Sequence, residues 1–114
     1  MVPTVARDYL TDFELMLLLA TLRAGDDAYG VTIAREIEAS GARTVMLGAV
    51  YTGLDRLEGN GLVASGVGAP TPERGGRAKR YFRVTPAGMK AIRQAKRALT
   101  RLWSGLPGLE SGRT

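Results

Sequence analysis

Cysteine and histidine are both absent from this 114-residue chain. Without them the protein has no disulfide bond, thiolate nucleophile or imidazole base, and most zinc and iron sites are excluded. Clustered carboxylates occur as Asp26 with Asp27 and Glu36 with Glu38, and no other type of metal ligand flanks either pair. The "GGR" at 75–77 lacks the lysine, hydroxyl residue and helix of a nucleotide-binding loop. We therefore expect that the protein is not an enzyme, that it has no catalytic or metal-binding residue, and that it holds no cofactor.

Long apolar runs are missing as well. No uninterrupted apolar segment reaches the length of about 18 residues that a membrane-spanning helix needs. The first residues also lack the basic start, apolar middle and small-residue cleavage site of an export signal. We therefore expect a cytoplasmic protein with no membrane partner. With 45% hydrophobic and 24% charged residues, the chain is expected to fold around one core.

Negative charge is scarce in the second half of the chain. Residues 61–114 hold eleven Lys or Arg and two acidic residues, a net charge of +9. Residues 1–60 hold five Arg and nine acidic residues, a net charge of −4. Such a basic half is where a polyanion would bind, although charge asymmetry can also serve only solubility. The elements that carry the charge must decide between these interpretations.

The segment 12–24 is predicted to form the first helix. Thr11 stands at the capping position, and Glu14, three residues on, has the capping-box spacing. The middle of this helix, residues 15–20, is apolar all round. We therefore expect one face to pack on the core and another to contact something else, such as a second subunit.

Two further helices are predicted at 30–40 and 47–61. The earlier one is expected to end at Gly41 in a left-handed cap. In the later helix, apolar side chains at helical spacing are expected to face the core, namely Leu47, Val50, Leu54 and Leu57. The opposite, exposed face would then carry Gly48, Ala49, Thr52, Asp55 and Arg56.

After the third helix the sequence period changes from helical to alternating. Strands are predicted at 62–67 and at about 79–84, joined by a loop rich in glycine and proline. Phe82 and Val84 share one face of the second strand, which is expected to be apolar. The other face carries Lys79, Tyr81 and Arg83. The prediction is a two-stranded hairpin with a basic outer side.

Thr85 followed by Pro86 predicts the start of a last helix, which should continue to about Ser104. Apolar residues recur along it at spacings of 3 and 4, at Ile92, Ala95, Leu99, Leu102 and Leu106. This stripe could fold back on its own subunit. Because the first helix already fills the local core, we favour pairing with the first and last helices of a second copy.

Three helices, a hairpin and a further helix describe a winged helix-turn-helix with a helix appended, a mainly α fold with a small β hairpin. The segments "AYGVTIAREI", "LGAVYTGLDRLEGNGLV" and "GGRAKRYFRVTPAG" resemble the PadR-like family of bacterial transcriptional regulators, in its short variety with a single C-terminal helix. The resemblance covers about residues 10–104. The matching positions are Tyr29, Gly30, Gly48, Tyr51, Gly61, Gly76, Tyr81, Thr85 and Gly88.

The resemblance and the residue pattern together predict a DNA-binding surface. On the third helix we expect contacts from Gly48, Ala49, Tyr51, Thr52 and Arg56. On the hairpin we expect them from Arg74, Arg77, Lys79, Arg80 and Arg83. The family implies that the hydroxyl of Tyr51 reaches a phosphate, although its ring could simply pack on the core edge. Met46 departs from the family pattern, because methionine cannot cap the third helix.

The expected function is that of a sequence-specific regulator, favoured as a repressor, which binds a pseudo-palindromic operator as a homodimer at the bacterial nucleoid. The alternative is a winged-helix module that joins proteins and binds no DNA. We expect residues 1–85 to bind DNA, 86–106 to dimerise and 107–114 to form a flexible tail. The expected dimerisation residues are Leu15, Leu18, Leu19, Met89, Ile92, Leu99, Leu102, Trp103 and Leu106.

Trp103 is the only tryptophan in the chain and borders the apolar stripe of the last helix. The favoured interpretation is that its indole fills the dimer interface, as large aromatic residues usually do. The resemblance offers an alternative, because related dimers enclose a space between their C-terminal helices. Two symmetry-related indoles could there flank a small, flat aromatic effector.

Overall fold

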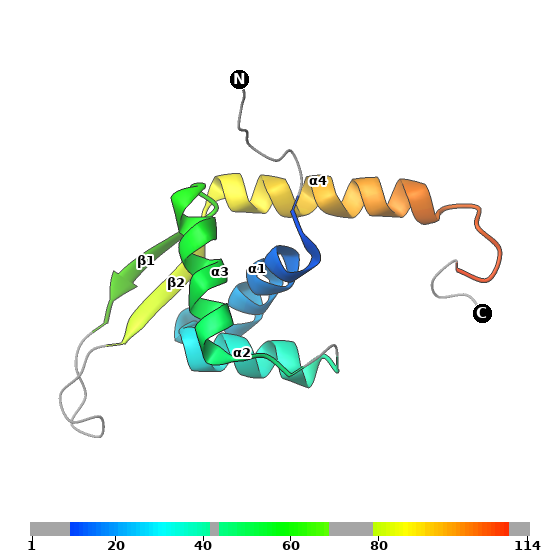
Figure 1. Cartoon of the computed structure of the whole chain (residues 1–114). Coiled ribbons are helices and arrows are strands. Elements are labelled where there is room, and N and C mark those ends of the chain that lie inside the picture. The colour runs from blue at the N-terminus through cyan, green and yellow to red at the C-terminus, as the bar shows by residue number, and fades with distance from the viewer. Residues whose placement is uncertain (1–9, 42–43, 69–78, 110–114) are drawn as a thin grey trace.

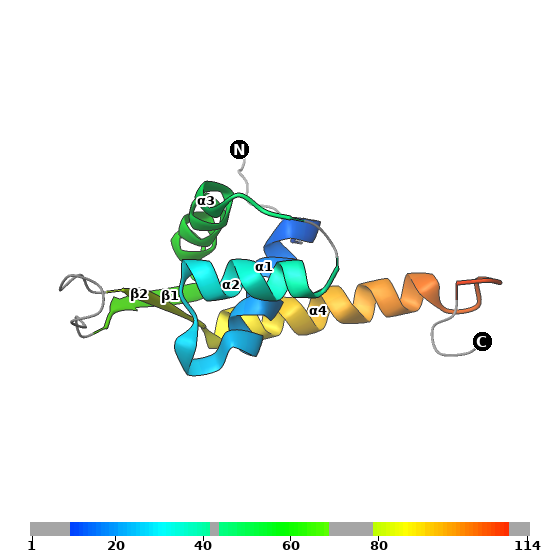
Figure 2. The same cartoon turned by 90° about the horizontal axis from the view of Figure 1, so that it is seen from below.

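The computed structural model describes residues 10–41, 44–68 and 79–109. Figure 1 shows a body of three helices from which a β hairpin and the free end of a long helix project in opposite directions. Figure 2 shows the same divergence from below. The elements are α1 (Asp12–Ala24), the 3-10 turn η1 (Gly25–Asp27), α2 (Gly30–Ala39), α3 (Leu47–Gly59), β1 (Val63–Val67), β2 (Arg80–Val84) and α4 (Pro86–Trp103). This order confirms the winged helix-turn-helix prediction.

Helix α1 begins and ends at the predicted residues, and its capping box is formed. The backbone N–H of Glu14 donates to Thr11 Oγ1 at 3.1 Å, and the N–H of Thr11 donates back to Glu14 Oε1 at 2.9 Å. Leu17 and Leu18 have no exposed surface. The expectation that Leu18 lies on a dimer face is therefore wrong. Because α1 contacts α2, α3, β2 and α4, the fold covers most of its circumference.

Helix α3 contacts α1 and α2, and its Val50, Leu54 and Leu57, none of which is exposed, belong to the common core. A Cβ atom added at Gly53 would overlap the Cδ1 atom of Leu17, so the small residue is what lets the two helices approach. Leu47, which was predicted to be in the core, is instead 42% exposed. It is the first residue of the helix and lies one turn before the buried stretch.

The hairpin strands pair antiparallel, with Val63 opposite Val84 and Val67 opposite Arg80. The other edge of β2 pairs with the chain just before α2, which the sequence did not predict. The N–H of Phe82 donates to the carbonyl of Ala28 at 2.8 Å, and a single bridge joins Tyr29 to Tyr81. The hairpin is therefore attached to the helical body along one strand. Its Phe82 side chain, 3% exposed, is part of the core.

Helix α4 starts at the predicted cap, where Thr85 Oγ1 accepts from the N–H of Gly88 at 3.1 Å. A Cβ atom at Gly88 would overlap the carbonyl oxygen of Leu62, so this end of α4 sits tightly on the hairpin base. Ile92 still packs against the core, but the following turns leave the body. None of the helices in the described ranges is both long and apolar enough to cross a membrane.

The close approach at Gly53 gives a stability prediction. Gly53→Ala should destabilise the fold by about 1–3 kcal/mol, because the added methyl group forces Leu17 out of its position. Gly48→Ala, in the same helix, is the matched control and should cost nothing, since its Cβ would point into open space. Urea denaturation measures both variants. Equal stability of the two would contradict the packing described for α1 and α3.

Candidate nucleic-acid interface

The outer face of α3 is open to solvent, as the sequence predicted. Gly48, Ala49, Thr52, Asp55 and Arg56 are all exposed. Within this set only the last three residues have side chains that can form hydrogen bonds. The first turn thus offers small or apolar groups and little direct readout of bases.

The start of α3 is more apolar than the sequence analysis suggested. Met46, at the capping position, is 76% exposed and gives the helix no side-chain hydrogen bond, in keeping with the departure noted above. The exposed Leu47 lies next to it. The N-terminal end of α3 therefore exposes two large apolar side chains to solvent.

Tyr51 joins α3 to α2 and to the hairpin. Its ring lies against Gly30, where an added Cβ atom would overlap the ring carbons and the hydroxyl oxygen. The ring centroid is 6.5 Å from that of Phe82. Tyr51 is half-buried, so the packing interpretation of its ring holds. The glycine of the Tyr29–Gly30 pair is explained by the space that this ring needs.

Two aromatic side chains and a lysine connect the hairpin to the start of α2. The Nζ atom of Lys79 lies 4.2 Å from the centroid of the Tyr29 ring, a cation–π distance. The Tyr81 and Tyr29 rings meet in an edge-to-face arrangement with centroids 5.6 Å apart. Lys79 is thus held at the loop end of the strands, where its carbonyl accepts from the N–H of Gly68. Arg74 and Arg77 lie outside the described residues.

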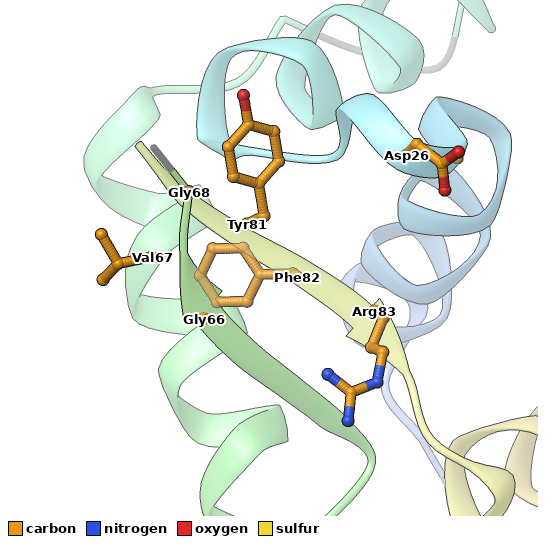
Figure 3. Close-up of a pocket in the computed structure, with 8 residues that line it drawn as sticks. Asp26, Gly66, Val67, Gly68, Tyr81, Phe82 and Arg83 are labelled. Atoms are coloured by element: carbon orange, nitrogen blue, oxygen red, sulfur yellow. The ribbon is translucent and has the colours of Figure 1, made fainter. Parts of the chain in front are cut away.

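Arg83 lies on the face of the hairpin that is turned away from α3. Figure 3 shows its guanidinium in front of the sheet, with α3 behind. This face borders an open pocket of about 370 Å³ between η1 and the hairpin. The lining residues are Gly25, Asp26, Gly66, Val67, Gly68, Tyr81, Phe82 and Arg83. The structure therefore does not bring Arg83 together with the exposed face of α3.

Arg80 was expected to contact DNA, and in the structure its guanidinium is held by groups of the same chain. Its Nη1 atom lies 2.9 Å from Asp55 Oδ1, and its Nη2 atom lies 2.7 Å from Glu58 Oε1. The remaining nitrogen, Nε, donates to Ser65 Oγ at 3.2 Å. All three guanidinium nitrogens thus contact groups of the same chain. Sequence reasoning missed these partners, because the pairing of residues 58 and 80 follows from the fold and from no local pattern.

Glu58 gathers donors from both strands. Its carboxylate accepts from the Ser65 hydroxyl at 2.8 Å, from the Ser65 N–H at 3.2 Å and from Arg80. The hydrogen bonds from Ser65, followed by those from Arg80 and its positive charge, lower the pKa of the Glu58 carboxyl below its usual value. The carboxylate therefore stays ionised to lower pH than in an unfolded chain.

Apolar surface remains exposed on α1 and α4. Leu15 is half-buried and Leu19 is 41% exposed on α1, and Leu22, which the sequence analysis did not single out, is 43% exposed. Met89 and Ile92 are half-buried at the start of α4. Farther along, the exposed large apolar residues are Leu99, Leu102, Trp103, Leu106 and Leu109.

Comparison with known proteins identifies the arrangement. Residues 18–94 match the model of the transcriptional regulator PadR-like family. The chain belongs to this family. It is 37% identical over 79 residues to transcriptional regulator Rv3488 of Mycobacterium tuberculosis, and the aligned region covers 69% of each protein. This PadR-like chain is therefore a transcriptional regulator, and its family and relatives are not enzymes.

Solved structures of other proteins share the fold. A PadR family regulator from Eggerthella lenta superposes with a TM-score of 0.66 at 21% identity, covering 86% of this chain and 83% of that one. RosR of H. salinarum superposes with a TM-score of 0.64 at 24% identity, covering 85% and 80%. At these identities the likeness shows the winged-helix fold alone.

The lowered pKa of Glu58 predicts a pH dependence. The link to Ser65 and Arg80 is intact above the pKa of about 4.3 of an unfolded glutamate, and its stabilisation is lost as the pH falls through the lower folded pKa. Carboxyl ¹³C NMR should give a Glu58 midpoint below that of a model peptide. Ser65→Ala and Arg80→Met should each raise this midpoint. An unchanged midpoint in Ser65→Ala would contradict the assignment of the cause.

Proposed function

We propose that this regulator binds double-stranded DNA sequence-specifically, with α3 in the major groove and the hairpin as the wing. The observation that carries the proposal is the division of α3 into a fully buried face and an exposed one, beside a strongly basic hairpin. Recognition helices of winged helix-turn-helix proteins present this arrangement to base edges. The alternative, a module that joins proteins without binding DNA, lacks such support.

Base readout by α3 would be sparse. Arg56 can donate to guanine, Thr52 can donate or accept, and Ala49 can contact a thymine methyl group. Gly48 allows close approach of the backbone. Affinity would then depend on phosphate contacts of the wing residues Arg74, Arg77, Lys79 and Arg83, and of the Tyr51 hydroxyl. Arg80 has no part in this proposal.

We also propose that the protein acts as a homodimer on a pseudo-palindromic operator. Residues 1–85 would bind DNA, residues 86–106 would dimerise and residues 107–114 would form a tail. Exposed leucines on α1 and on the free turns of α4 support pairing with a second copy. Covering a water-exposed apolar stripe lowers the free energy of the associated state. A dimer that covers a bacterial promoter would act as a repressor at the nucleoid.

The proposed base contacts predict a loss of discrimination. Thr52→Ala and Arg56→Ala should each reduce the affinity for a duplex enriched from a random pool by about 1–3 kcal/mol, and the affinity for random DNA by less. Fluorescence anisotropy at several salt concentrations measures both affinities, and native binding should weaken steeply with salt. Equal losses on both kinds of DNA would leave these residues a positioning role only. If the native protein binds neither the enriched duplex nor random DNA, the protein-joining alternative is favoured.

Trp103 tests the proposed dimer. If the indole fills the interface, Trp103→Ala should weaken dimerisation by about 3 kcal/mol or more, measured by analytical ultracentrifugation. Val67→Ala, an exposed apolar residue on β1, is the control and should leave the dimer unchanged.

A second role for Trp103 is binding of a flat aromatic effector between two α4 helices. It predicts that planar compounds quench the indole fluorescence and release the native protein from DNA. Compounds that do neither would exclude the effector role.

A further inference from the structure

Arg80 lies where the recognition helix meets both strands of the wing. The two carboxylates that it contacts, Asp55 and Glu58, project from α3 three residues apart. Its serine partner, Ser65, belongs to β1, and Arg80 itself belongs to β2. One guanidinium therefore connects all three elements. A planar fork with fixed donor directions holds such partners in one geometry, which a lysine would not do.

Glu58 also closes an edge of the hairpin. Ser65 lies opposite Phe82, and the N–H of Phe82 points away from β1, toward the carbonyl of Ala28. The N–H of Ser65 likewise points away from β2 and donates to Glu58 Oε2 at 3.2 Å. The carboxylate thus satisfies an edge donor that would otherwise face water or another strand. The backbone of β1 is tied to α3 at this residue.

The charges of this group do not favour a phosphate ligand. Arg80 supplies one positive charge, whereas Asp55 and Glu58 supply two negative charges within contact distance. Its guanidinium carbon also lies 4.8 Å from the Phe82 ring centroid, so the side chain is laid back against the core and away from the hairpin tip. A phosphate that contacted Arg80 in this position would lie beside the two carboxylates and be repelled by them.

We propose that Arg80, Asp55, Glu58 and Ser65 form a clamp that sets the angle of the wing relative to α3. Arg80 is a positioning residue of the DNA interface and not a DNA ligand. A two-stranded hairpin has little rigidity of its own, so its direction must come from such attachments. The role of the clamp in DNA binding rests on the proposed function. Its existence can be tested without DNA.

The first experiment measures amide hydrogen exchange in the native protein, in Arg80→Met and in Glu58→Met, with no DNA present. The Ser65 amide should exchange about fivefold faster or more in both variants, because its hydrogen bond depends on a Glu58 that Arg80 holds in place. The Phe82 amide, bonded to Ala28, should be unchanged. An unchanged Ser65 amide in Arg80→Met would overturn the clamp. Equal acceleration of both amides would also overturn it, since the whole hairpin would then be loosened.

The second experiment is a double-mutant cycle on affinity for a duplex enriched from a random pool. Glu58→Met and Arg80→Met should each weaken binding about threefold to tenfold, and the double variant should be no weaker than either single one. The loss in Glu58→Met would occur although a negative charge has been removed. Asp26→Ala, which removes a negative charge from η1 outside the clamp, is the control and should not weaken binding.

The opposite pattern would identify Arg80 as a DNA ligand. Glu58→Met would then bind more tightly, by releasing the guanidinium, and Arg80→Met would lose affinity equally or more in that background. Either result would overturn the proposal. If the native protein binds no DNA at all, the proposed function fails, and the exchange of the Ser65 amide still decides whether the clamp exists.

Discussion

The burial of one face of α3 against α1 is the constraint on which the rest of the structure depends. Val50, Leu54 and Leu57 are completely enclosed, and Gly53 removes the side chain that would keep Leu17 at a distance. Because this packing sets the rotation of α3 about its own axis, it also sets which residues lie on the opposite face. The side chains that α3 offers to a partner are therefore set by the core, and a helix rotated by one residue would offer different ones.

The wing is a two-stranded hairpin with little rigidity of its own, and several contacts attach it to the helices. Phe82 enters the core, Tyr81 packs on Tyr29, and the backbone of β2 bonds to Ala28. These contacts hold one strand, on the side of α2. The clamp around Arg80 holds the other strand, on the side of α3, so the hairpin is fixed from both edges. Part of the positive charge of the hairpin is thus structural, and counting basic residues overstates the charge available to DNA.

Local patterns predicted most of the fold. The caps at Thr11 and Thr85, the bounds of α1 and the alternation in β2 follow from interactions within a few residues, so the sequence alone contains them. Leu18 and Leu47 were misjudged, and the partners of Arg80 were missed, because distant segments build their surroundings. Periodicity shows that a helix has an apolar face, but it does not show how far a neighbouring helix covers that face. A basic residue on a hairpin likewise looks free until the carboxylates of another helix are placed beside it.

In the proposed complex, α3 and the wing of each subunit of a dimer bind one of two related half-sites in DNA. Hydroxyl-radical footprinting on a duplex enriched from a random pool by the native protein tests it most directly. A dimer should protect two tracts related by two-fold symmetry, with centres one helical turn of about 10 base pairs apart, or a multiple of it. A single tract, or uniform cleavage at protein concentrations that saturate the duplex, would contradict it.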